Sequence, residues 1–373
     1  MQVNLNGRVP ERQMLTAEES GPPKRCNARE PPLLQCAELV LPYLNPSELA
    51  NVSLTSKPLF KLSRTITIRR ASDASRTFET LPIPFLNTVD SHPYAPFLYT
   101  RSLVLSSPLS LLRQPWGSSA VSPSAQSRLL SAESVGFVDG EGRAMSGCEC
   151  EACDGGECPC AGLDGLDDVG RECGPGCWCG PECGNRLTRN GVAVRVKIVR
   201  HRRKGWGLHA DQLIAKSQFV FEYAGHPSSG VSNNDINLKM TELTGELLTT
   251  KEAQRRHQYY DELASQGRFS SALLVVREHL PSGKACLRLN IDATRLGNIA
   301  RFVNHSCDGG NLSTKLVRSS GALLPRLCFF ASKDIPVDEE LTFSYGEIRK
   351  RSKGLPCFCN SPSCVGTLPS EDT

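Results

Sequence analysis

The stretch Arg301–Cys307, RFVNHSC, says more about the fold of this 373-residue chain than any other. Alone it reads as an ordinary loop, and it gains meaning from the C-terminal tail. There Cys357 and Cys359 stand as Cys-x-Cys, and Cys364 follows after four further residues. Structural zinc takes four nitrogen or sulfur ligands in a closed tetrahedral site, so these three cysteines lack one ligand. Cys307 can supply it, and a zinc ion bound in this way would hold the tail against the loop.

A further motif, LTFSYG at Leu341–Gly346, lies between the loop and the tail. RFVNHSC, LTFSYG and the cysteine tail, in this order, resemble the SET-domain protein lysine methyltransferases. The resemblance extends from about Pro82 to the C-terminus, and it is specific because several independent motifs share one order. It implies a mainly β chain with α insertions: a SET-domain β-clip-type fold with a pseudoknot, flanked by cysteine-rich zinc modules and a short N-terminal helical segment.

Length and composition fit a protein of two or three domains that carries metal. The N-terminus has no apolar segment of the secretory type, and no apolar run approaches the 18 residues that indicate a membrane span, so no membrane partner is expected. Seventeen cysteines in such a chain indicate metal binding rather than disulfides, because reducing compartments keep thiols free. The net charge of +4 is too small to imply nucleic-acid binding.

Charge is unevenly distributed along the chain. Residues 148–183 contain nine Asp and Glu and a single basic residue, Arg171. Residues 186–204 contain eight Lys and Arg and no acid. Such a basic stretch would suit chromatin, and an ordinary solvated face is the alternative interpretation.

The resemblance and the local composition together predict five segments. They are a disordered tail at 1–30, an F-box-like helical segment at 31–65, a pre-SET zinc module at 80–190 with a serine-rich insertion at about 102–146, a SET catalytic domain at 191–347 and a post-SET zinc tail at 350–373. The insertion is inferred from eleven serines between Ser102 and Ser134, and Pro82–Asp90 with Phe97-Leu98-Tyr99 resembles the start of the pre-SET module.

The N-terminal segment carries helix signals. The residues Leu33, Ala37, Val40 and Leu44 recur at three-to-four spacing, and Asn45-Pro46 is typical of a second helix start. We expect Leu49, Val52 and Phe60 to form the apolar face that follows. Residues 32–62 resemble an F-box, which implies a Skp-type partner, and a helical hairpin packed on the neighbouring domain is the alternative.

Within the predicted SET domain the pattern is mostly that of strands. Alternating Val192, Val194, Val196 and Ile198 predict a strand, and the sequences Ala272–Leu280 and Ala285–Ile291 on either side of Pro-Ser-Gly predict a hairpin. Residues 241–266 are rich in Glu, Leu, Lys, Arg and Gln, which predicts a helix.

Nine cysteines lie upstream of the SET domain. Three zinc ions need twelve metal–sulfur bonds, which nine thiolates supply if three of them bridge. The pattern resembles the triangular pre-SET zinc cluster of the suppressor-of-variegation class, although its first block is more tightly spaced, and two ordinary zinc sites with one spare thiol are the alternative. The predicted ligands are Cys148, Cys150, Cys153, Cys158, Cys160, Cys173, Cys177, Cys179 and Cys183. Together with the tail site they imply about four zinc ions.

The family resemblance also implies a site for S-adenosylmethionine. The family binds this cofactor through main-chain contacts at Lys204-Gly205-Trp206-Gly207, and Arg301, Phe302, Asn304 and His305 complete the site. Glu222-Tyr223-Ala224-Gly225 matches the next family motif, except that His226 replaces the usual glutamate.

Tyr345 matches the catalytic tyrosine of the family, and Tyr223 and Phe343 are expected to line the lysine channel. A phenylalanine at 343 leaves room for added methyl groups, which favours dimethyl and trimethyl products. This chain departs from the family at Ser344, where an aspartate is common, and in residues 271–290, which contain no aromatic. We therefore expect the channel either to be wider or to be completed by Phe302, Phe358 or the helical insert.

These features together resemble enzymes that methylate histone H3 at lysine 9, and the chain looks most like the plant suppressor-of-variegation-related group. The expected activity is S-adenosylmethionine-dependent histone-lysine N-methylation of the H3 tail or nucleosome, in the nucleus and on chromatin. A catalytically silent, zinc-rich chromatin scaffold and an F-box-type ubiquitin-ligase adaptor are the alternatives.

Overall fold

The computed structural model describes residues 32–105, 130–131, 147–153, 158–160, 169–224, 226–229, 255–256, 259–260, 262–263, 272–279, 286–322, 324–346 and 355–369. The predicted tail at 1–30 and most of the serine-rich insertion lie outside them. Most of the predicted helix at 241–266 does too, but its six described residues are helical. In the described part of the chain no helix is both long and apolar enough to span a membrane.

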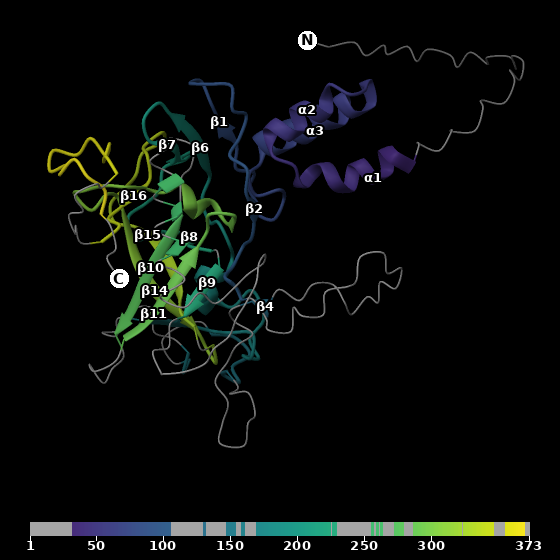
Figure 1. The fold of residues 1–373 in the computed structure, drawn as a ribbon. Helices are drawn as coiled ribbons and strands as arrows, with labels where there is room; N and C mark the ends of the chain where they lie inside the picture. The colour runs from purple at the N-terminus through teal and green to yellow at the C-terminus, as the bar shows by residue number, and fades with distance from the viewer. Residues whose placement is uncertain are drawn as a thin grey trace, which may run out of the picture.

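Three helices stand together at one side of a β-rich body (Figure 1). The helical elements are α1 (Pro32–Val40), η1 (Leu41–Tyr43), α2 (Pro46–Ser53), α3 (Lys57–Ser72), η5 (Gly184–Arg189) and η6 (Ile299–Phe302). The strands are β1 (Phe85–Leu86), β2 (Leu98–Tyr99), β3 (Val104–Leu105), β4 (Leu130–Ser131), β5 (Val169–Glu172), β6 (Val196–His201), β7 (Gly205–Ala210), β8 (Phe219–Glu222), β9 (His226–Ser229), β10 (Leu273–His279), β11 (Cys286–Asp292), β12 (Leu296–Gly297), β13 (Asn304–His305), β14 (Leu312–Ser319), β15 (Arg326–Ala331) and β16 (Thr342–Phe343). The expected mainly β fold is confirmed.

The start of α2 follows from its capping residues. The Asn45 side chain accepts a hydrogen bond from the Glu48 amide at 3.0 Å, and the Glu48 carboxylate accepts one from the Asn45 amide at 2.8 Å. This reciprocal capping box satisfies two amide donors that would otherwise lack partners, and Pro46 sits where a missing N–H costs nothing. The helix start predicted at Asn45-Pro46 is therefore confirmed.

The helical segment has a small core of its own, which includes Leu41, Leu49 and Ile66. The predicted apolar face was partly wrong. Leu49 is buried, but Phe60 is 48% exposed, and Leu33 and Val40 are more exposed still. The reason is that Phe60 lies in a third helix, α3, which continues past residue 65 to Ser72 and buries Ser63, Ile66 and Arg70 instead, so that Phe60 faces solvent.

The helical segment contacts the β-rich body through Arg70 of α3. Its guanidinium donates hydrogen bonds to the Leu44 carbonyl at 2.9 Å and to the Tyr94 hydroxyl at 3.1 Å, and it lies over the Tyr94 ring. Tyr94 belongs to the main core of the body. Arg70 therefore joins the turn before α2 to the segment that precedes the pre-SET cysteines.

The described part of the body consists of several small sheets. The largest has the strand order β5-β14-β15-β8, and two three-stranded sheets have the orders β1-β6-β7 and β10-β11-β9. Two-stranded pairs are β12-β2, β13-β16 and β3-β4. The hairpin predicted within residues 272–291 is confirmed, because β10 and β11 pair antiparallel from Leu273↔Asp292 to His279↔Cys286.

The most consequential pairing joins β13 to β16. It is parallel, with Asn304 opposite Thr342 and His305 opposite Phe343, so the RFVNHSC and LTFSYG motifs lie side by side. Further bonds run from the Ser306 amide to the Phe343 carbonyl and from the Asn311 amide to the Thr342 carbonyl. This crossing of two segments far apart in sequence is the pseudoknot expected of the SET fold.

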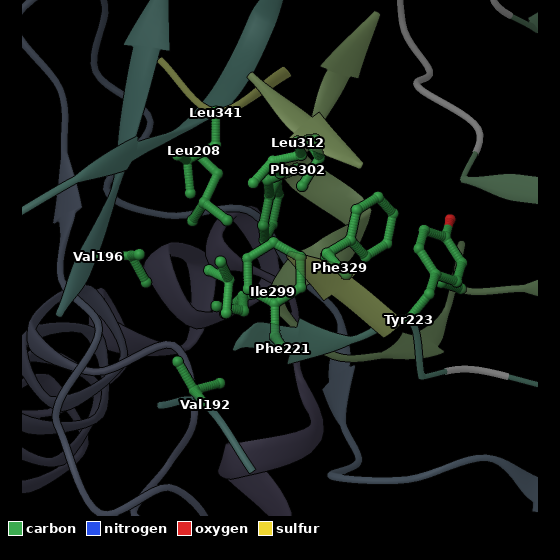
Figure 2. Packing of buried hydrophobic residues seen from close by; sticks show 14 of the residues in the cluster. Val192, Val196, Leu208, Phe221, Tyr223, Ile299, Phe302, Leu312, Phe329 and Leu341 are labelled. Carbon is green, nitrogen blue, oxygen red and sulfur yellow. The ribbon is translucent and has the colours of Figure 1, made fainter. Parts of the chain in front are cut away.

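The main core lies between the sheets (Figure 2). Phe221, Phe329, Ile299 and Leu208 are fully buried in it. The rings of Phe221 and Phe329 are 5.3 Å apart, and that of Tyr223 is 6.3 Å from Phe329 on its other side. Alternation along Val192–Ile198 buries every second side chain, as predicted, although the strand itself begins only at Val196.

A buried ion network ties the end of the pre-SET region to the SET core. Arg326, 3% exposed, donates to Glu172 at 3.0 Å and to Glu222 at 3.3 Å. Glu172 in turn accepts from the amide and the hydroxyl of Thr188. Two buried carboxylates thus share one guanidinium, which keeps neither charge unpaired.

Candidate active site and zinc sites

All nine upstream cysteines gather in one cluster. Among their described sulfur atoms, three sets of four lie within 4.8 Å of one another: Cys148, Cys153, Cys173 and Cys179; Cys148, Cys158, Cys160 and Cys173; and Cys148, Cys150, Cys153 and Cys158. Cys148 belongs to all three sets. Thiols shared between sets of four are what a bridged cluster requires, whereas two separate zinc sites would use disjoint sets.

The sulfur spacing fits zinc. A tetrahedral site with zinc–sulfur bonds of about 2.3 Å places its sulfurs about 3.8 Å apart. The Cys148 sulfur lies 3.7 Å from that of Cys153 and 3.8 Å from that of Cys173, and the Cys160 and Cys177 sulfurs are 3.8 Å apart. These distances are far longer than a disulfide bond, and the cysteines are free. The cluster can therefore hold zinc.

The tail folds back onto the RFVNHSC loop. The sulfurs of Cys307, Cys357, Cys359 and Cys364 lie within 4.8 Å of one another, and those of Cys307 and Cys357 are 3.8 Å apart. This is again the edge of a zinc–thiolate tetrahedron. The four-thiol set inferred from the spacing of the sequence is thus brought together by the fold, and it too can hold zinc.

His305 connects this thiol set to the predicted catalytic tyrosine. Its imidazole Nδ1 accepts a hydrogen bond from the Tyr345 amide at 3.1 Å, so the proton of the neutral ring lies on Nε2, 3.3 Å from the Cys307 sulfur. Burial lowers the pKa of His305 and so favours this neutral form, although hydrogen bonding at Phe343 opposes the shift. The His305 imidazole is therefore held by a contact at each of its two ring nitrogens.

The two segments predicted to hold the cofactor are in contact. The Asn304 amide nitrogen donates to the Trp206 carbonyl at 3.3 Å and to Glu340 Oε1 at 2.8 Å. Lys204 forms an ion pair with the other oxygen of Glu340. Burial alone would raise the pKa of Glu340, but the hydrogen bonds from Lys204 and Asn304 outweigh it and lower the pKa, so the carboxylate is ionised. A cation, an amide and a carboxylate thus lie at one point.

Arg301 and Phe302, also predicted as cofactor residues, point into the protein. The Arg301 guanidinium donates to the carbonyls of Ala293 and Thr294, both at 2.9 Å, and stacks on the rings of Phe97 and Phe302. Burial lowers the pKa of Arg301 to about 10. Phe302 is 6% exposed in the core. Both side chains therefore contact the protein interior and support the RFVNHSC loop from its buried side.

The three residues predicted for the lysine channel belong to one chain of aromatic rings. The Phe343 ring lies 5.0 Å from that of Tyr345 and 4.9 Å from that of Phe329. The Phe329 ring in turn lies beside that of Tyr223, 6.3 Å away (Figure 2). Phe329, on β15, was missed in the sequence because it lies in an ordinary strand pattern without a motif. It is fully buried and holds the Tyr223 and Phe343 rings in a common wall.

The hydroxyl groups of the two tyrosines have fixed partners. Tyr345 donates to the Val303 carbonyl at 2.7 Å, and Tyr223 donates to the Ala272 carbonyl at 2.9 Å. Burial raises the pKa of Tyr345, with a smaller contribution from the nearby charge of Glu340, and burial likewise raises the pKa of Tyr223. Both phenols therefore stay protonated at neutral pH, and neither is suited to act as a general base.

Of the three candidates for the missing aromatic of residues 271–290, the helical insert lies beside the hairpin in question. Tyr260 is 8% exposed, and its hydroxyl donates to Asp292 at 2.9 Å, beside the strand that was expected to supply a ring. Phe302 faces the core instead, and Phe358 lies against Arg203.

The basic stretch at 186–204 is only partly a surface. Arg186 is buried and donates to the Cys179 carbonyl, Lys197 pairs with Asp211 and Asp338, and Arg200 pairs with Asp90. Much of this stretch therefore holds the cysteine cluster and the β6-β7 hairpin in place, which neither interpretation of the charge run had anticipated.

Comparison with known proteins identifies the family. The SET domain model matches residues 205–346. Histone-lysine N-methyltransferase SUVR3 of Arabidopsis thaliana is 50% identical over 96% of this chain and 100% of its own length. The SETMAR histone-lysine N-methyltransferase of Mus musculus is 33% identical over 54% of this chain and 60% of its own.

Solved structures show the same relationship. The methyltransferase domain of human SETMAR superposes with a TM-score of 0.55 at 25% identity, covering 80% of this chain and 97% of that one. KRYPTONITE, solved with mCHG DNA and SAH, gives a TM-score of 0.52 at 25% identity, covering 80% of this chain and 53% of that one. With the motifs, the fold and a relative that matches it over nearly its whole length, this chain belongs to the SET-domain histone-lysine N-methyltransferases.

Proposed function

We propose that this chain uses S-adenosylmethionine to methylate lysine 9 of histone H3, and that its products include the dimethyl and trimethyl forms. The observation that carries the proposal is the position of Tyr345. Its ring belongs to the aromatic wall, its amide is bound by His305, and its hydroxyl reaches the Val303 carbonyl, one residue from Asn304 of the cofactor segment. A tobacco relative described as H3 lysine-9 specific is 30% identical over 79% of this chain and supports the choice of lysine.

The residues around Glu340 have the chemistry to hold the cofactor. The amino-acid end of S-adenosylmethionine carries an ammonium and a carboxylate, and Lys204, Asn304 and Glu340 together offer a cation, an amide donor and an anion. Gly205, with φ +80°, turns the backbone in a way that favours glycine, and a Cβ there would make an ordinary contact with Arg200 Nη1 at 3.7 Å. When bound, the cofactor supplies an electrophilic methyl group on a positively charged sulfur.

The chain must then present the substrate lysine as a neutral amine. A free lysine has a pKa of about 10.4, so deprotonation at pH 7 costs about 4–5 kcal/mol. A channel walled by Phe343, Tyr345 and Tyr223 disfavours the charged amine by desolvation, and a nearby sulfonium disfavours it by like-charge repulsion. The proton is released to solvent, and the aromatic wall limits the return of water.

Tyr345 is placed to orient this amine. Its single hydroxyl proton is already donated to Val303, so towards substrate its oxygen can only accept. Accepting one N–H of the neutral amine leaves the nitrogen lone pair free to face the methyl group. Such alignment is a major source of rate acceleration in displacement reactions.

Phe343 bears on the number of methyl groups added. It is 6% exposed and contacts the Tyr345 ring. Having no hydroxyl, it cannot hold the amine or a water molecule by a hydrogen bond, so a methylated amine can rotate and accept a further methyl group.

The decisive experiment uses the zinc-loaded chain, radiolabelled S-adenosylmethionine and a panel of histone H3 peptides. We expect label on the N-terminal peptide, loss of label when lysine 9 is replaced by arginine, and dimethyl and trimethyl products by mass spectrometry. Label that persists on the lysine 9 variant would refute the proposed lysine, and label on no histone would favour a silent chromatin scaffold. We propose the nucleosome, in the nucleus, as the natural setting of this reaction.

We also propose that the helical segment at 32–62 binds a Skp-type protein. The supporting observation is a group of large apolar side chains that face solvent: Leu33, Leu39, Tyr43 and Leu54, each more than 70% exposed. Purified Skp-type protein should bind the wild-type chain and lose affinity when Leu39 and Leu54 are both replaced by serine. Equal binding by both forms, or none, would rule this partner out.

A further inference from the structure

Two histidines and a glutamate converge beside the cofactor segment, outside both cysteine sites. His201 ends β6 and His209 lies in β7, and their Nε2 atoms are 3.0 Å apart. Glu340 Oε1 lies 3.9 Å from His201 Nε2, and the three ligand atoms are all within 4.8 Å of one another. We propose that His201, His209 and Glu340 form a site for a divalent transition-metal ion, distinct from the zinc–thiolate sites and sharing Glu340 with the proposed cofactor site.

The β6-β7 hairpin explains why the two rings meet. In its register Val199 pairs with Gly207 and His201 pairs with Gly205, so His201, Gly207 and His209 project from one face. Gly207 lies between the histidines, and a Cβ there would come within 2.8 Å of both His201 Nε2 and Glu340 Oε1. The missing side chain at Gly207 is what lets an imidazole and a carboxylate share this space.

The surroundings of His209 set its lone pair towards the site. Its Nδ1 lies 2.7 Å from the Asp338 carbonyl, which can only accept, so Nδ1 carries the proton and Nε2 is free to bind a metal. Metal-binding histidines commonly have such a backbone partner on the other nitrogen. The backbone around Asp338 is itself fixed by two hydrogen bonds. The Asp338 amide donates to the Ala210 carbonyl, and the Leu341 amide donates to the Leu208 carbonyl.

The geometry indicates which ions fit. Two imidazole nitrogens bound about 2.1 Å from a metal lie about 3.0 Å apart when the bonds are at right angles, and about 3.4 Å apart in a tetrahedron. The observed 3.0 Å between the histidine nitrogens is nearer the right-angled pair, and the 3.9 Å between His201 Nε2 and Glu340 Oε1 corresponds to a wider angle at the ion. Imidazole and carboxylate ligands in such a geometry suit nickel and copper, with the remaining positions open to water. The alternative is a hydrogen bond between the two rings with no metal.

The test is equilibrium dialysis of the untagged, zinc-loaded chain against Ni²⁺, with nickel and zinc measured together in each sample. We expect one nickel ion per chain while the zinc content stays unchanged. His201→Gln and His209→Gln should each weaken nickel binding at least about tenfold, because each removes one ligand. The matched control is His92→Gln, which replaces an imidazole that is 64% exposed and should leave nickel binding unaltered.

Three results would overturn the proposal. They are no nickel bound by the wild-type chain, equal binding by the His201 and His209 variants, and nickel gained only as zinc is lost. Zinc content reports whether each variant is folded, since the cysteine sites depend on the fold. The two histidines lie on different strands. If one variant loses zinc and so is not correctly folded, the nickel affinity of the other variant still tests the proposal.

Discussion

Tyr345→Phe separates catalysis from folding because it removes a single oxygen. The ring keeps its contacts with Phe343 at 5.0 Å and with His305 at 5.3 Å, and only the 2.7 Å hydrogen bond to Val303 is lost. If that oxygen orients the amine in the transition state, kcat should fall at least about 100-fold, or about 2.7 kcal/mol. Zinc content and cofactor affinity should stay close to wild type.

Loss of stability cannot produce so large an effect. A buried hydrogen bond contributes about 0.5–1.5 kcal/mol, and a carbonyl left without a partner costs about 1–3 kcal/mol. For a protein with an unfolding free energy of about 5 kcal/mol, even a loss of about 3 kcal/mol leaves about 97% of the molecules folded. Activity would then change by a few per cent, well below the expected loss.

Tyr99→Phe is the matched control. Tyr99 is 7% exposed, and its hydroxyl donates to Glu79 over the same 2.7 Å, but it lies outside the aromatic wall. We expect this variant to lose at least as much stability in urea unfolding and to keep its kcat for methyl transfer. Wild-type kcat in Tyr345→Phe on every histone tested would show that Tyr345 does not orient the amine.

Three further outcomes are expected. Elemental analysis should find about four zinc ions per chain, and Cys307→Ser should lower that number by about one; two zinc ions or fewer would rule out the bridged cluster. Phe343→Tyr should keep monomethylation and suppress the higher products, so an unchanged product distribution by mass spectrometry would contradict the assigned role of the ring. Arg326→Gln leaves two buried glutamates facing each other and should lower the unfolding free energy by about 3–5 kcal/mol in urea. Its control, Lys333→Gln, removes an exposed ion pair and should cost less than about 1 kcal/mol, and equal losses in both would refute the importance of burial.

Features that depend on local chemistry were predictable from the sequence. The capping pair Asn45 and Glu48 acts over one helical turn, and the pairing of β10 with β11 follows two strand patterns separated by Pro-Ser-Gly in the sequence. The tail site was also predictable, although Cys307 and Cys357 are far apart in sequence. Zinc demands four ligands, so three cysteines in the tail imply a fourth elsewhere.

Features that depend on packing between distant segments were not predictable. Phe329 carries no motif, and its place between Tyr223 and Phe343 follows from the β8-β15 pairing. Phe60 has the spacing of a buried residue but lies on the exposed side of α3. Arg186 reads as part of a basic surface, yet it is buried against Cys179, because the pattern of charges does not reveal which of them find internal partners.

The four-thiol set of the tail and the proposed catalytic tyrosine, Tyr345, are joined by a short series of contacts, which would give the tail a role beyond stability. Cys307 lies 3.3 Å from His305 Nε2, and His305 Nδ1 accepts the amide of Tyr345. A zinc ion that fixes the Cys307 sulfur also fixes the imidazole, because a ligand sulfur cannot move independently of the metal. The Tyr345 backbone is then held at its amide while its hydroxyl is held by Val303. Since displacement reactions depend steeply on alignment, loss of the tail zinc should lower kcat even where the cofactor still binds.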